Sequence, residues 1–81
     1  MKINELDYYE KSLLYTKFAQ FIDKLEEDAV YDEKNADEHL EAAKNPDGTI
    51  DKDCWNYRQY ISFTKEAEAL EKIRFCLQDL L

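Results

Sequence analysis

The sequence holds little of the material that forms turns. Its 81 residues include one glycine and one proline, the two residue types that most strongly interrupt helices and strands. Few, long secondary-structure elements are therefore expected. A chain of this length buries only about 60% of its unfolded surface, so we expect helices that share one core, supplemented by dimerisation.

Long apolar runs are also missing. No stretch approaches the roughly 20 apolar residues of a membrane span, and residues 1–7 lack the unbroken apolar segment of a secretory signal. Aromatic residues make up 14% of the chain, which argues against disorder although 37% of the residues are charged. The sequence thus predicts a folded, soluble, cytoplasmic protein without membrane contact.

Side chains that carry catalysis are scarce. His39 is the one histidine, and no carboxylate or thiol stands three or four residues from it, so we place it on the surface without a metal ion. Neither serine lies in a glycine-flanked nucleophile elbow, and one glycine cannot build a phosphate-binding loop. Cys54 and Cys76 would lie about 33 Å apart on one helix, too far for a disulfide. The sequence predicts no enzyme activity and no cofactor.

Two stretches have the apolar periodicity of long helices. A stripe centred on Phe18 predicts a helix over about residues 4–44, and a face centred on Leu70 predicts a second helix over about residues 51–80. The expected fold is all-α, with one domain over residues 1–81. It is either a long antiparallel helical hairpin or a three-helix bundle, and it dimerises into a larger bundle.

The ends of these helices are predicted from capping residues. Asn4 would begin the first helix and Asp51 the second. We expect a kink or short break in the first helix near residues 32–36, because Asn35 followed by Glu38 could cap a new helix. The alternative is an unbroken helix, because Ala36, Leu40 and Ala43 stay in phase with the Phe18 stripe.

A turn is predicted over residues 45–50, where Asn-Pro-Asp-Gly fits a type I turn. Part of it resembles the middle of a calcium-binding EF-hand loop. Ala43 and Cys54, however, stand where that loop requires carboxylates, so we expect a plain turn that binds no metal. The residues that carry the resemblance are Asn45, Asp47, Gly48, Thr49, Ile50 and Asp51.

Six apolar side chains fall outside the main faces of the two predicted helices. Either another helix or a second copy of the chain covers them, or they form a docking surface on which Tyr and Phe are good anchors. They are Leu6, Tyr9 and Leu13 in the first helix and Tyr57, Ile61 and Phe75 in the second.

The net charge of −8 is concentrated in the middle of the chain. Residues 23–53 hold twelve acids and four bases, whereas residues 1–22 hold three of each and residues 54–81 four of each. This distribution disfavours direct binding of nucleic acid and favours a basic partner. The acidic patch that we expect to bind it consists of Glu26, Glu27, Asp28, Asp32, Glu33, Asp37, Glu38 and Glu41.

The sequence therefore predicts a non-catalytic regulator or inhibitor that docks on a basic, nucleic-acid-binding surface of a larger protein. In size and charge it is similar to small acidic phage and mobile-element proteins that mimic DNA and block CRISPR nucleases (anti-CRISPR proteins) or restriction enzymes. The alternative is a structural self-association module, a homodimer whose acids only keep it soluble.

Overall fold

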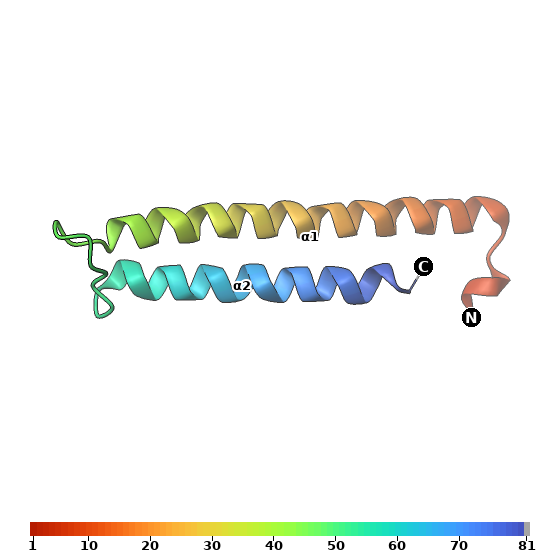
Figure 1. The fold of residues 1–81 in the computed structure, drawn as a ribbon. Helices are drawn as coiled ribbons and strands as arrows, with labels where there is room; N and C mark the ends of the chain where they lie inside the picture. Colours follow the sequence, from red (N-terminus) through yellow and green to blue (C-terminus); the bar gives the residue numbers. More distant parts are fainter. Residues whose placement is uncertain (81) are drawn as a thin grey trace.

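The chain forms a hairpin of two long α-helices. A computed structural model describes residues 1–80, in which α1 (Tyr8–Ala42) and α2 (Trp55–Gln78) lie antiparallel in a rod of 63 × 16 × 15 Å (Figure 1). A short 3-10 helix, η1 (Ile3–Glu5), precedes α1. The predictions of an all-α fold and a long helical hairpin are confirmed. Residues 1–80 contain no β-strand and no third α-helix.

The start of α1 is set by a capping box. The Asp7 carboxylate accepts a hydrogen bond from the Glu10 N–H at 2.7 Å, and the Glu10 carboxylate accepts one from the Asp7 N–H at 2.9 Å. These bonds satisfy two donors that a helix end otherwise leaves unpaired, so α1 begins at Tyr8 rather than near Asn4. The helix continues without a break through Asn35, whose side-chain amide donates to the Tyr31 carbonyl at 2.8 Å instead of capping a new helix.

The predicted turn is present. The Gly48 N–H donates to the Asn45 carbonyl at 2.9 Å, which closes a β-turn. Gly48 has a φ of 88°, which glycine adopts without strain. Both the N–H and the hydroxyl of Thr49 donate to Asp47, at 3.0 and 2.6 Å, and these bonds lower the pKa of the Asp47 carboxyl.

The start of α2 differs from the prediction. Asp51 does not cap the helix, because its carboxylate accepts a hydrogen bond from the Asp53 N–H at 3.0 Å within the turn. Cys54 occupies the capping position, but its thiol donates to the Asp51 carbonyl at 3.2 Å and forms no capping hydrogen bond; α2 begins at Trp55.

The two helices meet along a seam whose residues are spaced alternately three and four apart, as in a coiled coil. In α1 the seam consists of Ile22, Leu25, Ala29, Asp32, Ala36 and His39, and it continues to Ala43 after the helix; in α2 it consists of Asn56, Tyr60, Phe63, Ala67, Leu70, Arg74 and Leu77. The buried apolar residues of residues 1–80 are one leucine and four alanines; Ala29 is only 1% exposed, but no large side chain is completely buried. The core of the hairpin is therefore thin.

Two polar residues of α1 lie in this seam. Asp32 is only 4% exposed and packs against Glu66 of α2. Burial raises the pKa of the Asp32 carboxyl above its usual range, and the neighbouring Glu66 and Asp28 raise it further. Because no cation pairs with Asp32 in the part of the chain that the structure describes, its charged form destabilises the seam.

The other is His39, which the sequence analysis placed on the surface. Its ring stacks on Phe63, with 5.6 Å between ring centroids, and meets the Trp55 ring edge-on at 5.4 Å. Nδ1 lies 3.0 Å from Oδ1 of Asn56, a distance at which the imidazole N–H donates to the amide. The surface prediction for His39 is therefore wrong, because this half-buried histidine packs between the helices.

The helices differ in length, so the hairpin ends unevenly. α1 has 35 residues and α2 has 24. Arg74, near the end of α2, lies opposite Glu26, which leaves residues 8–20 of α1 beyond the last turn of α2 (Figure 1). We call residues 8–20 the overhang; at 1.5 Å per residue it is about 20 Å long.

Candidate functional site

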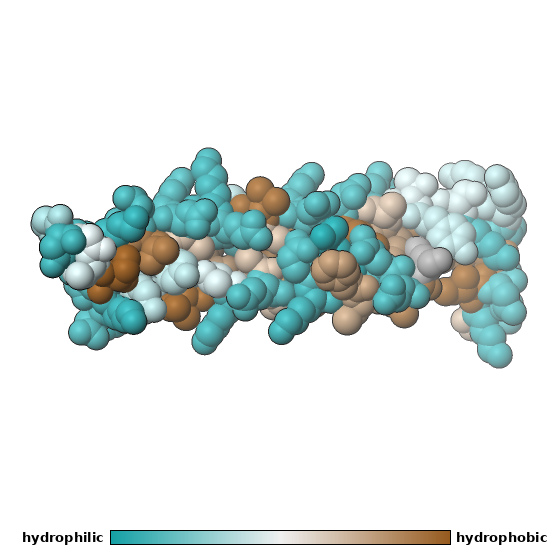
Figure 2. Space-filling model, in the orientation of Figure 1, coloured by the Kyte–Doolittle hydropathy of each residue, from teal (hydrophilic) through white to brown (hydrophobic). Residues whose placement is uncertain are grey.

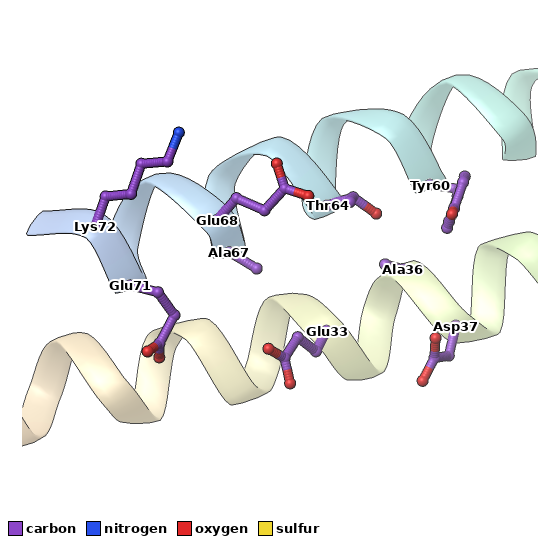
Figure 3. A pocket seen from close by; sticks show the side chains of 9 residues that line it. All are labelled: Glu33, Ala36, Asp37, Tyr60, Thr64, Ala67, Glu68, Glu71 and Lys72. Carbon is purple, nitrogen blue, oxygen red and sulfur yellow. The ribbon is translucent and has the colours of Figure 1, made fainter. Parts of the chain in front are cut away.

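A groove runs between α1 and α2 near the middle of the rod. It has a volume of about 460 Å³, and Figure 3 shows the side chains that line it. Ala36 and Ala67, each 4% exposed, form its floor. The walls are formed by Glu33 and Asp37 of α1 and by Tyr60, Thr64, Glu68, Glu71 and Lys72 of α2.

The groove is strongly acidic. Four carboxylates and one ammonium line it. Glu71 is already paired, since its carboxylate lies 2.8 Å from the Arg74 guanidinium. Glu33, Asp37 and Glu68 form no ion pair and no side-chain hydrogen bond with any of residues 1–80. These three carboxylates are available to a cationic group from outside the chain.

Arg74 stands beside the groove and joins the two helices. Besides Glu71, its guanidinium reaches Glu26 of α1 at 3.8 Å and lies 5.5 Å from the centre of the Phe75 ring. Its hydrogen bond and charge interaction with Glu71 raise the already high pKa of Arg74. This contact neutralises part of the acidic surface, and the unpaired carboxylates of the groove, those of Glu33, Asp37 and Glu68, lie further toward the turn.

The predicted acidic patch does not form one surface. Glu33 and Asp37 are exposed in the groove, whereas Asp32, predicted to face a partner, is buried in the seam. Asp28 is half-buried and pairs with Lys24 at 2.9 Å. The remaining predicted members are exposed, and they are Glu26, Glu27, Glu38 and Glu41, the last paired with Lys44 at 2.8 Å.

The predicted apolar contact residues remain largely uncovered. Tyr9 is 73% exposed, Leu13 45% and Phe75 62%, and Leu6, Tyr57 and Ile61 are half-buried. Other large apolar side chains are also exposed, and Figure 2 shows hydrophobic areas at several places along the rod between hydrophilic side chains. No single apolar patch thus stands out from the rest of this surface.

Sequence analysis missed the half of the groove that α2 contributes. Residues 54–81 have balanced charges, and this balance hid the fact that Glu68 and Glu71 lie on the side of α2 that faces the acids of α1. The three-and-four spacing of the seam was a usable signal. Had it been extended through Asp32 and His39, it would have placed Glu33 and Asp37 at the edge of the contact between helices.

Among the described residues, no group of three or more His, Cys, Asp or Glu side chains is arranged to hold a metal ion. Cys54 and Cys76 are free thiols. No described helix combines the length and apolar character needed to cross a membrane.

Comparisons with protein families, with curated proteins and with solved structures find no match for this chain. The function is therefore argued from the groove and the surface that surrounds it.

Proposed function

We propose that this protein is a non-catalytic binding protein whose acidic groove docks on a basic surface of a larger protein. The observation that carries the proposal is the set of three carboxylates, from Glu33, Asp37 and Glu68, that stand around an alanine floor without an ion-pair partner in residues 1–80. Unpaired acids that converge from two helices attract a cation more strongly than acids spread over one solvated face.

The shape of the groove suits an arginine or a lysine of the partner. The aliphatic stem of either side chain can pack on Ala36 and Ala67, while its charged head reaches the carboxylates at the rim. Arginine fits best, because its planar guanidinium donates two parallel hydrogen bonds to one carboxylate. Tyr60, at one end of the groove, offers an aromatic ring to the same cation.

The acids beyond the groove support a regulatory or inhibitory role. Exposed carboxylates continue along α1 toward the turn, among them Glu38 and Glu41. A rod with this charge can occupy a surface that binds the phosphates of a nucleic acid and so compete with the nucleic acid. The protein would then inhibit its partner as a DNA-mimic protein does, without chemistry of its own.

The test compares two variants of equal charge. The groove variant carries Glu33→Gln, Asp37→Asn and Glu68→Gln. The control carries three similar substitutions at exposed acids outside the groove lining, Asp23→Asn, Glu27→Gln and Asp79→Asn. Proteins captured from a lysate of the encoding organism are compared at about 50 mM and about 500 mM salt, since salt screens charge contacts.

The proposal predicts a partner that the wild type captures at low salt and releases at high salt. The groove variant should bind this partner at least tenfold more weakly, and the control variant should bind nearly as well as the wild type. Equal losses in both variants would show that only the overall charge matters, and the absence of a salt-sensitive partner would refute the proposal.

A further inference from the structure

We propose, on the basis of the function given above, that the acidic groove binds an amphipathic α-helix of the partner protein. The apolar side of this helix packs between α1 and α2, and its arginines and lysines lie along both of its edges. The bound helix runs along the rod and completes a three-helix bundle. Three features of the hairpin support this: the groove, the apolar side chains that extend it and the acids on both of its walls.

Apolar side chains continue the groove side of the rod beyond the groove itself. Residues seven apart on a helix lie on the same side of it, and four apolar residues stand seven positions from a residue that lines the groove. They are Leu40, seven after Glu33; Tyr57, seven before Thr64; and Ile61 and Phe75, seven before and seven after Glu68. Phe75 is 62% exposed and the other three are half-buried. Near the turn, the ring of Tyr57 lies 5.7 Å from that of Tyr60, which lines the groove.

The acids determine the charge of the bound element. The unpaired carboxylates of Glu33 and Asp37 come from α1, and that of Glu68 comes from α2 (Figure 3). A helix that lies between them meets negative charge along both edges, so basic side chains at those edges pair with it. A second copy of this chain is disfavoured in the groove, because its own groove side carries the same acids and like charges repel.

The walls of the groove favour a helix over an extended segment. Helices satisfy their backbone hydrogen bonds internally, so α1 and α2 offer no backbone edge with which an extended segment could pair. A bound α-helix satisfies its own backbone groups and needs only side-chain contacts with the groove. The groove side of α2 from Tyr57 to Phe75 is about 27 Å long, which matches a helix of about 18 residues.

The hairpin also gains stability from a third helix. The buried apolar residues of residues 1–80 are one leucine and four alanines, and small domains with so little core commonly need further burial. A helix bound in the groove supplies apolar contacts that the hairpin lacks. Binding should therefore raise the melting temperature of the protein.

Three synthetic peptides of about 18 residues test the proposal on the full chain. The first has leucines on one side of a helix and arginines along both edges of that side. The second has the same composition in shuffled order, and the third has glutamate in place of every arginine. Anisotropy of a labelled peptide measures binding, and circular dichroism measures the helix gained on mixing. The first peptide should bind about tenfold more tightly than the second, gain helix and raise the melting temperature, whereas the third should not bind.

Two exposed residues of α2 locate the bound helix. Phe75 lies on the groove side, and Ile73, 47% exposed, lies nearly opposite because two residues turn a helix by about 200°. Phe75→Ser should weaken binding of the first peptide about tenfold, and Ile73→Ser should leave it nearly unchanged. Exchanging the exposed Glu33, Asp37 and Glu68 together for lysine should transfer binding from the arginine peptide to the glutamate peptide.

Equal binding of the first two peptides would overturn this inference while leaving the proposed function in place, because the groove would then recognise basic charge without a helix. Equal losses in Phe75→Ser and Ile73→Ser would overturn it too. So would a dimer of the chain alone that Phe75→Ser abolishes, since a second copy would then cover the groove. Failure of all three peptides to bind would also refute it, and the capture experiment above, which requires no helix, would decide the proposed function separately.

Discussion

Replacing Asp32 should make the protein more stable at neutral pH, although most substitutions of buried residues destabilise a fold. Asp32 is 4% exposed, lies in the seam against Glu66 and has no cationic partner in the described chain. Its charged form is therefore buried beside another carboxylate. Leucine would fill the same seam position with an apolar side chain, as Leu25 does one heptad earlier.

The size of the effect follows from burial. Burying a leucine side chain contributes about 1.5–3 kcal/mol, and removing an uncompensated buried charge adds to this gain. The groove leaves one side of the seam open to solvent, so a leucine at position 32 would be incompletely buried. We therefore expect Asp32→Leu to raise the free energy of unfolding by about 2 kcal/mol at pH 7. For a domain of this size that corresponds to a rise in Tm of about 10 °C. Asp32→Asn, which removes the charge but leaves a polar group, should give about half as much.

The effect of Asp32 on the free energy of unfolding should also change with pH in a known direction. The pKa of Asp32 is raised in the folded state. Its stabilising contribution is therefore complete below the unfolded-state pKa of about 3.9, and it is lost as the pH rises through the higher folded-state pKa. On acidification from pH 7, the stability difference between Asp32→Asn and the wild type should shrink.

The assay is thermal unfolding followed by circular dichroism from pH 7 to pH 4, at one protein concentration. Asp37→Asn serves as the control, because it removes an equal charge from an exposed position on the same helix. If Asp32→Leu melts at or below the wild-type temperature at pH 7, or if the two Asn variants show the same pH dependence, the account of the seam is wrong.

The turn and the aromatic contact of His39 give two further predictions. Gly48→Ala should lower the free energy of unfolding by about 1 kcal/mol, because alanine is strained at a φ of 88°. The added methyl group itself would meet no atom within 4 Å. Urea unfolding measures the change, and an unchanged midpoint would contradict the assigned turn. His39→Ala should destabilise the hairpin by about 1–2 kcal/mol, because the contacts with Phe63 and Trp55 are lost. It should also shift the fluorescence emission of Trp55. An unchanged emission spectrum would argue against the packing of His39 on the Trp55 ring.

The hairpin itself could be predicted from the sequence because few signals compete with it. One proline and one glycine lie together at the turn, and the apolar periodicity on either side is long. The beginnings of the helices were harder to place. Asn4 and Asp51 are good capping residues, but Asp7 forms the better capping box with Glu10, and the Asp51 carboxylate is used within the turn.

The site was only partly accessible to sequence reasoning. Glu33 and Asp37 were predicted as binding residues because local charge density is visible in one stretch of sequence. Whether Glu68 and Glu71 face the groove depends on how α2 is rotated about its axis. The balanced net charge of residues 54–81 does not show which side of α2 faces α1. Asp32 was placed in the acidic patch because it was grouped with the acids next to it in sequence, whereas the structure buries it between Ala29 and Ala36 of the seam.

The claim on which the account depends is that the groove between α1 and α2 receives a basic side chain. Titrating the isotope-labelled protein with a short arginine-containing peptide, followed by NMR, tests it directly. The account predicts saturable shifts of the amide signals of Ala36, Thr64 and Ala67, which vanish at about 500 mM salt. Shifts that are absent, or that spread equally to Glu27 and Glu38 outside the groove, would contradict it.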